Sequence, residues 1–159
     1  MKAPLLAMLF TLPVPFAQAA PADDGLSLRA AALIADAAQR EAQAQGYAIV
    51  VSLYDQHGNL KYFRRMDATA SGSIQVSQLK ANTSAAFPVA SEVLAQRSAA
   101  LPGNPYGAVP GFLLLEGGLP IFDRQQRHVG GIGISGATPE LDRAFAEAGL
   151  TAYAACEAC

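Results

Sequence analysis

The sequence is poor in the residues that metal sites and strongly charged interfaces require. Its 159 residues contain two histidines, two cysteines, no tryptophan and 15% charged residues, with a formal net charge of −2. Because no run of Lys or Arg is present, nucleic acid and anionic membranes are disfavoured as main partners. Cys156 and Cys159 have no further metal ligands nearby in the sequence. We therefore expect a terminal disulfide or free thiols there.

The sequence has one long apolar run, residues 3–16, next to the N-terminus. It is shorter than the roughly 20 residues of a membrane-spanning helix, and Pro13 and Pro15 interrupt it. A basic start and the A-x-A site at Ala17–Ala19 are typical of a cleaved secretory signal. We therefore expect a periplasmic or secreted protein without a membrane segment after cleavage. Its expected segments are a signal peptide (1–19), a mobile leader (20–25), a single domain (26–155) and a CxxC tail (156–159).

Hydrophobic periodicity and turn residues predict an α/β (α+β) domain with the order α-β-β-α-α-β-β-β-α. The sheet is expected to be five-stranded, mainly antiparallel and packed with helices. Hairpin-length connections exclude the alternating βαβ units of nucleotide-binding folds, so no nucleotide cofactor is expected. The expected helices are 27–45, 74–87, 91–97 and 139–153, and the expected strands are 47–54, 60–66, 112–115, 119–122 and 129–135.

The last expected strand has one face with almost no side chains. Ile132 and Ile134 alternate with Gly131, Gly133 and Ser135, so the isoleucines share one face and the small residues the other. Such a bare face either receives a closely packed helix or lines a ligand-accepting wall. The glycine pattern matches neither a nucleophile elbow nor a dinucleotide-binding fingerprint.

Few side chains are candidates for holding a metal or haem iron. His57 lies in a hairpin turn and His128 at the start of the last strand, and the alternative is that both are exposed loop residues. Tyr106, Tyr54, Tyr62 and Met66 are further candidate axial ligands. Lys80 and Thr83 share a helix and could present an ammonium and a hydroxyl to carboxylates at a pocket edge. The alternative is a lysine whose stem lies along apolar surface.

Several ordered motifs at specific spacing resemble one known family. They are Asp55-x-x-Gly58-Asn59-Leu60, Arg65-Met66-Asp67, Lys80-Ala81-x-Thr83, Gly117-Gly118-Leu119-Pro120-Ile121, Gly130-x-Ile132-Gly133-Ile134-Ser135-Gly136 and Thr138-Pro139-x-x-Asp142. Over residues 26–155 the sequence resembles the HbpS/GlcG-like haem-binding (haem-degrading) family. The resemblance implies a profilin-like fold, a homo-oligomer, and binding of haem or another tetrapyrrole.

The resemblance also implies a site. It suggests a pocket wall made of the helix with Lys80 and Thr83, the Gly117-Gly118 turn, and the strand end with Gly133 and Ser135. The turn at 123–127 departs from the tight Asp-Gly turn of the family, because it is longer, charged and without glycine. The full set of haem-binding candidates is His57, His128, Tyr106, Arg64, Arg65, Met66, Lys80, Thr83, Gly117, Gly118, Gly133 and Ser135.

Three functions are consistent with these features. The first is an exported haem-binding protein for haem or iron sensing, storage or degradation, in which Lys80, Arg64 or Arg65 meets the propionates and a histidine or tyrosine the iron. The second is an enzyme that degrades haem or acts on a small hydroxy acid, using Lys80, Thr83 and Asp142. It ranks lower because the sequence shows no acid–base pair. The third is an oligomeric interaction or sensory module without catalytic activity.

Overall fold

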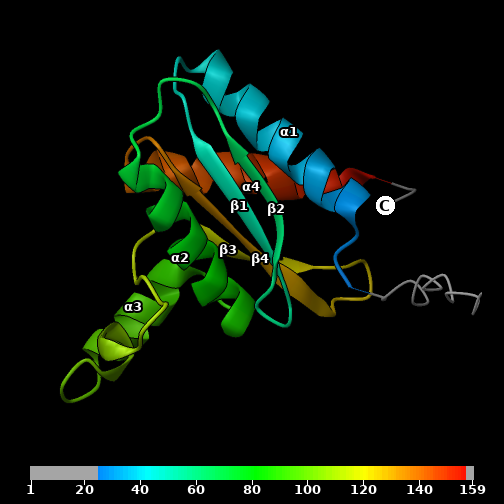
Figure 1. Ribbon diagram of the computed structural model, residues 1–159. Coiled ribbons are helices and arrows are strands. Elements are labelled where there is room, and N and C mark those ends of the chain that lie inside the picture. The colour runs from blue at the N-terminus through cyan, green and yellow to red at the C-terminus, as the bar shows by residue number, and fades with distance from the viewer. Residues whose placement is uncertain (1–24, 157–159) are drawn as a thin grey trace, which may run out of the picture.

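The computed structural model describes residues 25–156, which form four α-helices, four strands and one short 3-10 helix (Figure 1). The elements are α1 (Leu28–Ala44), β1 (Val50–Asp55), β2 (Leu60–Arg65), α2 (Gly72–Ala86), α3 (Ser91–Ala99), η1 (Pro105–Ala108), β3 (Gly118–Phe122), β4 (His128–Ser135) and α4 (Pro139–Ala155). The expected signal peptide, nearly all of the leader and the last three residues of the tail lie outside the described residues.

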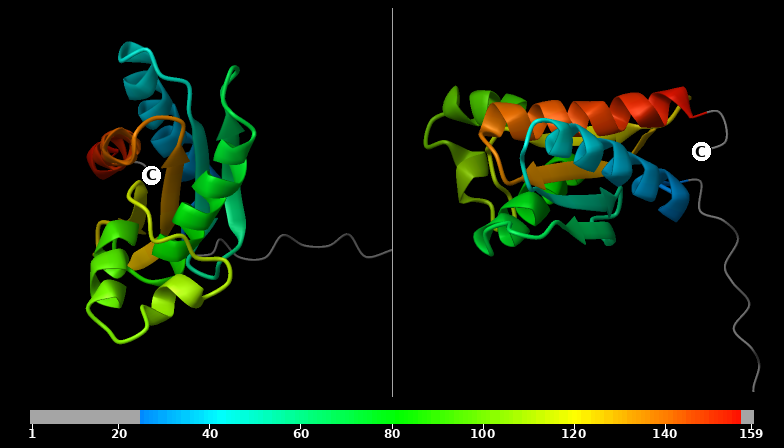
Figure 2. Two further views of the ribbon diagram at one scale, coloured as in Figure 1. Left: turned by 90° about the vertical axis from the view of Figure 1, so that its left-hand side faces the viewer. Right: turned by 90° about the horizontal axis from the view of Figure 1, so that it is seen from above.

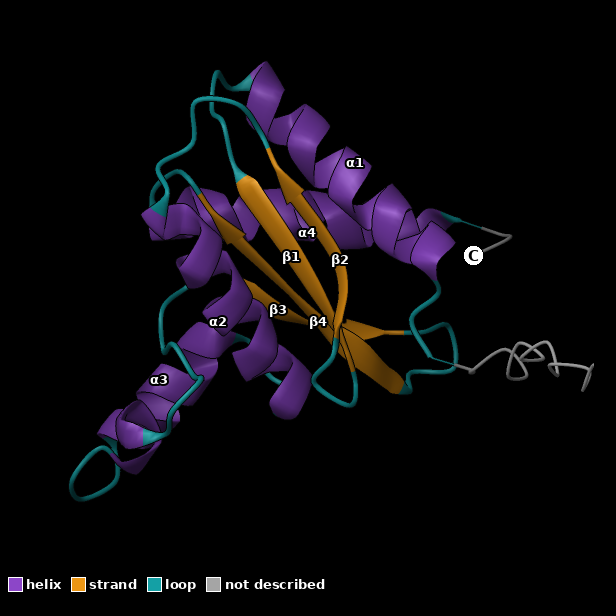
Figure 3. Ribbon diagram, viewed as in Figure 1, coloured by secondary structure: helices purple, strands orange, loops and turns teal. Residues whose placement is uncertain are grey.

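The four strands form one antiparallel sheet in the order β2-β1-β4-β3 (Figure 3). Two hairpins, β1–β2 and β3–β4, are joined through the central pair β1–β4. Val50 pairs with Ser135 and Asp55 pairs with Gly130. Because β1 and β4 run in opposite directions, the end of β1 lies beside the start of β4. The two hairpin turns therefore lie at the same end of the sheet.

Helices cover both faces of the sheet, with α1 and α4 on one side and α2 on the other (Figure 2). The main apolar core lies on the α1–α4 side and contains Val51, Leu53, Ile132 and Ile134, none of them more than 1% exposed. On the opposite side α2 packs on β1, β4 and β3. The alternation along β4 thus directs its isoleucines to the core and its glycines to α2.

The expected α/β class and the four helices are confirmed, and two of the helices begin with the expected caps. The hydroxyl of Ser27 accepts a hydrogen bond from the backbone N–H of Ala30, 3.0 Å away. The hydroxyl of Thr138 accepts one from the N–H of Leu141, and Pro139 takes the first position of α4. Within the described residues, no helix is long and apolar enough to cross a membrane.

The expected strand at 112–115 is wrong, and the sheet has four strands instead of five. The backbone groups of this segment bond to side chains of helices. The N–H of Leu113 donates to the hydroxyl of Thr83, 2.9 Å away, and the carbonyl of Leu115 accepts from the hydroxyl of Ser91. Because these hydroxyls satisfy the backbone, the segment crosses over α2 and α3 without joining the sheet.

Candidate functional site

The glycine face of β4 is covered by α2. A Cβ atom on Gly131 would lie 2.5 Å from the carbonyl oxygen of Ala81, and one on Gly133 would lie 2.1 Å from that of Ser77. Only glycine permits backbone to approach backbone so closely. Of the two interpretations of this face, close helix packing is the one found. Gly133 is in contact with a helix and does not lie on the wall of an open cavity.

Lys80 lies on the buried side of α2 and is 1% exposed. Its Nζ donates to Oδ2 of Asp142, 2.8 Å away, and to the carbonyl oxygen of Ile134, 2.9 Å away. Asp142 also accepts from the N–H of Ala137. Burial raises the pKa of the Asp142 carboxyl, while the hydrogen bond and charge of Lys80 act against this rise. The ammonium therefore neither reaches a pocket edge nor lies along the surface.

The Gly117-Gly118 turn packs on this ion pair. Gly117 has a φ of 109°, and a Cβ atom there would lie 2.8 Å from both Nζ of Lys80 and Cβ of Asp142. A Cβ on Gly118 would lie 2.5 Å from the carbonyl oxygen of Lys80. The structure thus brings together several expected pocket residues. They form a tightly packed junction of α2, β3 and α4 instead of an open wall.

The two histidines are placed differently. His57 is exposed in the β1–β2 turn, where its backbone N–H donates to Oδ1 of Asp55, 2.9 Å away. His128 is half-buried, with its Nε2 3.2 Å from the carbonyl oxygen of Ser84 and its ring centroid 5.6 Å from that of Phe122. The His57 ring therefore has the greater access to a ligand.

The two arginines of β2 lie on opposite faces of the sheet. The guanidinium of Arg64 pairs with Asp36 of α1 and donates to the hydroxyl of Tyr62. The guanidinium of Arg65 donates to the hydroxyl and carbonyl oxygens of Thr69, at the entry to α2. The two side chains therefore cannot hold the same small ligand on one face.

The remaining candidates support neighbouring segments. Met66 accepts a hydrogen bond at Sδ from the N–H of Ile49, 3.3 Å away, and packs at the edge of the core. Tyr106 lies in η1, where its ring is 5.6 Å from that of Phe87. Ser135 is 7% exposed at the end of β4. None of these groups lies in the turn that contains His57.

A first cavity lies between α2 and the β1–β2 hairpin, with a volume of about 390 Å³. Its polar groups include the side chains of Gln75, Gln78 and Asn82, on one side of α2. Its lining residues are Tyr54, Gly58, Gln75, Gln78, Leu79, Asn82 and Gly111. Gly58 directly follows His57 in the turn, which therefore lies at the rim of this cavity.

The face of β2 beside this cavity is only partly covered. Phe63 pairs with Ser52, whose hydroxyl is 2.9 Å from that of Ser77 on α2. Paired residues point to the same face, so Phe63 lies on the α2 side, where 39% of it is exposed. Arg65, two residues further along β2, shares this face.

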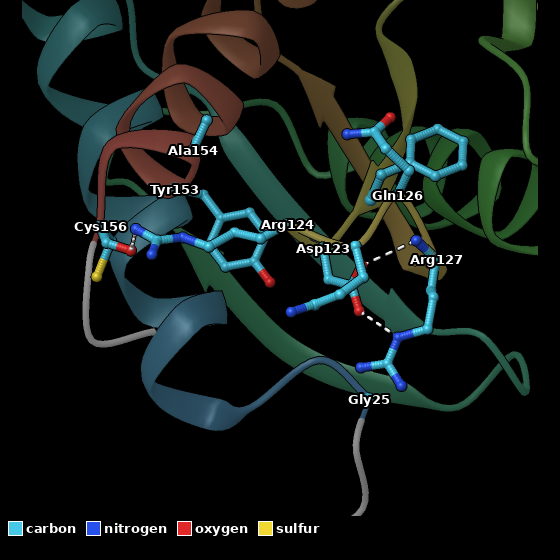
Figure 4. A pocket seen from close by; sticks show the side chains of 10 residues that line it. Gly25, Asp123, Arg124, Gln126, Arg127, Tyr153, Ala154 and Cys156 are labelled. Carbon is cyan, nitrogen blue, oxygen red and sulfur yellow. Dashed lines mark hydrogen bonds and ion pairs between the residues drawn. The ribbon is translucent and has the colours of Figure 1, made fainter.

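A second cavity, of about 440 Å³, lies where the β3–β4 turn meets the end of α4 (Figure 4). Its lining includes Phe122, Asp123, Arg124, Arg127 and Tyr153. The turn at 123–127, which differs from the family pattern in sequence, therefore forms part of the wall of this cavity.

Comparison with known proteins identifies the family. Residues 26–151 match the family model described as haem degrading protein HbpS-like. The chain belongs to the HbpS-like family. A double mutant of HbpS from Streptomyces reticuli is 31% identical, with a TM-score of 0.75 over 89% of this chain and 96% of that one. A PduOC:haem complex is 29% identical, with a TM-score of 0.72 over 80% of this chain and 94% of that one.

A curated relative of this HbpS-like chain is an uncharacterized 15.0 kDa protein of Citrobacter freundii. It is 29% identical over 131 residues, which make up 80% of this chain and 92% of the relative. The comparisons confirm the family resemblance seen in the sequence and the profilin-like layout of helices on an antiparallel sheet.

The sequence of this HbpS-like chain did not predict the two cavities described above, since each is formed by segments that are distant in the chain. The first could have been sought from the amide side chains of Gln75, Gln78 and Asn82, which recur at helical spacing. The second could have been sought from the charged residues of the turn at 123–127. Among the described residues, no group of three or more His, Cys, Asp or Glu side chains could hold a metal ion.

Proposed function

We propose that this protein is an exported haem-binding protein that holds haem in the cavity between α2 and the β1–β2 hairpin. The observation that carries the proposal is the similarity to the PduOC:haem complex over 80% of this chain, within a family described as haem-degrading. We propose this cavity as the location because it lies beside the more exposed histidine and beside a partly covered face of the sheet.

The residues around this cavity fit a tetrapyrrole chemically. Leu79 and the partly exposed ring of Phe63 supply apolar surface for a flat macrocycle. The volume of about 390 Å³ is within the range of small-molecule pockets, and the partly covered face of β2 lies beside it. The amide side chains along α2 would hydrogen-bond the edges of the ligand.

His57 is the proposed iron ligand. It lies in the turn at the cavity rim, and its ring is exposed. Tyr54 lines the same cavity, but burial raises the pKa of its phenol, which disfavours the phenolate form that binds iron. His128 is held at the start of the central strand β4, between Ser84 of α2 and Phe122 of β3. Imidazole is also a common axial ligand of haem iron.

Arg65 is the proposed partner of the haem propionates. It lies on the same face as Phe63, and guanidinium groups bind carboxylates through paired hydrogen bonds. Lys80 and Arg64 are less suitable, because Lys80 is buried against Asp142 and Arg64 lies on the α1 side with Asp36. Since Lys80 and Asp142 hold each other inside the fold, we propose ligand binding instead of turnover as the main function.

A haemin titration of the mature protein, beginning at Ala20, tests the proposal through the Soret absorbance band. We expect saturable binding, with a band that is weakened or shifted in His57→Ala and unchanged in the matched variant His128→Ala. Arg65→Gln is expected to weaken binding about tenfold, through loss of a charge-assisted contact. An unsaturable response of the folded wild-type protein would overturn haem binding. A band altered only in His128→Ala would instead place the ligand at the start of β4.

Export and assembly are separate parts of the proposal. N-terminal sequencing of the protein from a periplasmic or culture fraction should find Ala20 as the first residue, whereas retention of residues 1–19 would contradict export. Light scattering of the purified protein should give the mass of a homo-oligomer. Recovery of bound haem intact would favour a role in sensing or storage. Breakdown of bound haem would favour a role in degradation.

A further inference from the structure

The cavity at the β3–β4 turn is separate from the proposed haem site. It lies on the side of the sheet that carries α4, whereas the haem cavity is lined by α2 and the β1–β2 hairpin. Its volume of about 440 Å³ is within the range of pockets that hold small molecules. Figure 4 shows Arg124 beside Tyr153, and Arg127 paired with Asp123 further along the turn.

The walls of this cavity are held in place by two internal contacts. Asp123 accepts hydrogen bonds from the backbone N–H and the Nε of Arg127, 2.8 and 2.7 Å away. This fixes the turn of the hairpin. The guanidinium of Arg124 donates to the carbonyl oxygen of Cys156, which joins the turn to the end of α4. Turn and helix end therefore form one preorganised wall.

Charge in the cavity favours an anion. Among the described lining residues, Arg124 and Arg127 are positively charged and only Asp123 is negatively charged, and Asp123 is paired with Arg127. The hydrogen bond from Arg124 to Cys156 ends on a neutral carbonyl oxygen, and no carboxylate among the described residues forms an ion pair with Arg124. A planar guanidinium on a preorganised turn is well suited to a carboxylate.

The cavity also offers one hydroxyl and one apolar ring. The phenol of Tyr153 is partly buried, and burial together with the negative charge of Asp123 raises its pKa, while the positive charge of Arg124 acts against this rise. Phe122 is 38% exposed and lines the same cavity. The phenol can donate to a second carboxylate oxygen, and the Phe122 ring can pack against an apolar group.

From this arrangement we propose that the cavity binds a small carboxylic acid with an apolar or aromatic body, its carboxylate held by Arg124 and Tyr153 and its body by Phe122. The carboxylate could belong to a free acid or to a haem propionate, and we assign the site to a free acid because none of the described residues that line this cavity also lines the proposed haem cavity.

Calorimetric titration of the mature protein with sodium benzoate at low ionic strength tests this assignment, with benzamide as the neutral ligand of matched size. We expect saturable benzoate binding that weakens as salt is added, because screening reduces the charge interaction. Arg124→Gln should weaken benzoate binding about 10- to 100-fold, and Tyr153→Phe about 3- to 10-fold. Arg124→Lys, which keeps the charge without the planar fork, should lie between wild type and Arg124→Gln.

The matched control is Arg97→Gln, on the exposed last turn of α3, which should leave benzoate binding unchanged. Absence of saturable benzoate binding, equal binding of benzamide, or equal losses in Arg97→Gln and Arg124→Gln would each overturn the site.

A haemin titration separates the two sources of carboxylate. If Arg124→Gln weakens haemin binding and leaves benzoate binding intact, the assignment to a free acid is wrong. Loss of haemin binding in His57→Ala with intact benzoate binding would leave this second site standing.

Discussion

Lys80 and Asp142 form a buried ion pair that joins α2 to the first turn of α4, with 2.8 Å between Nζ and Oδ2. The two residues are 62 positions apart in the sequence, and both side chains are at most 3% exposed. The Gly117-Gly118 turn packs directly on this pair. Family motifs that suggested a ligand pocket are thus brought together as a structural junction.

Replacing Lys80 with methionine should strongly destabilise the fold, because it leaves the Asp142 carboxylate buried without its counter-charge. Removal of one partner of a buried pair typically costs about 3–5 kcal/mol. We expect a loss of this size in the free energy of unfolding measured with urea. The double variant Lys80→Met/Asp142→Leu should recover part of it.

The control for this prediction is Lys61→Met, on the exposed edge strand β2, which should change stability by no more than about 0.5 kcal/mol. A Lys80→Met protein as stable as wild type would show that Asp142 is satisfied without the ammonium.

Gly133→Ala should prevent the normal packing of α2 on β4. The new Cβ would lie 2.1 Å from the carbonyl oxygen of Ser77 and 2.4 Å from the amide nitrogen of Ala81, and backbone atoms cannot rotate away. We expect a loss of at least about 3 kcal/mol or failure to fold, measured by urea unfolding and circular dichroism.

Gly72→Ala is the matched control, because nothing lies within 4 Å of a Cβ atom at this first position of α2. It should be neutral or stabilising by up to about 1 kcal/mol, since alanine favours helix. Equal behaviour of the two variants would contradict the close packing of α2 on β4.

The elements set by local signals could be predicted from the sequence. Ser27 and Thr138 both cap helices as expected, since a cap depends on residues only three positions apart. The alternation along β4 predicted one bare face, but it could not decide between helix packing and a ligand wall. That choice depends on α2, which is about fifty residues earlier in the chain.

Features that depend on distant partners could not be predicted. The run Phe112–Leu115 has the composition of a strand, but the hydroxyls of Thr83 and Ser91 satisfy its backbone from 24 to 30 residues away. The partner of Lys80 is likewise set by tertiary structure. Both cavities depend on turns that meet only in the folded protein, so the candidate site could be listed by residue type but not located.

Thr83→Val should release the segment that crosses α2. The hydroxyl of Thr83 donates to the carbonyl oxygen of Leu79, 2.8 Å away, and accepts from the N–H of Leu113. Valine keeps the shape but leaves that N–H without its acceptor, which costs about 1–3 kcal/mol. We expect faster hydrogen exchange at the Leu113 amide, and Thr83→Ser, which retains a hydroxyl, should restore the wild-type rate. Unchanged exchange in Thr83→Val would mean that another group accepts this hydrogen bond.

The turn that contains His57 should lose stability in acid because of Asp55. Burial acts to raise the pKa of this carboxyl, but hydrogen bonds from the backbone and side chain of Asn59 and from the backbone of His57 hold it below its ordinary value of 3.8. In the unfolded chain the carboxyl binds its proton at the ordinary pKa. Its contribution to stability is therefore fully present above about pH 4 and is lost as the pH falls through the lower pKa of the folded state.

Urea unfolding of wild type and Asp55→Asn over a series from pH 6 to pH 2 measures this contribution. Wild type should be more stable by about 1 kcal/mol at pH 6, the size of a typical hydrogen bond, and the difference should vanish at the acid end. Asp67→Asn, in the exposed loop before α2, should show no such trend. A difference that persists unchanged to pH 2 would contradict a lowered pKa.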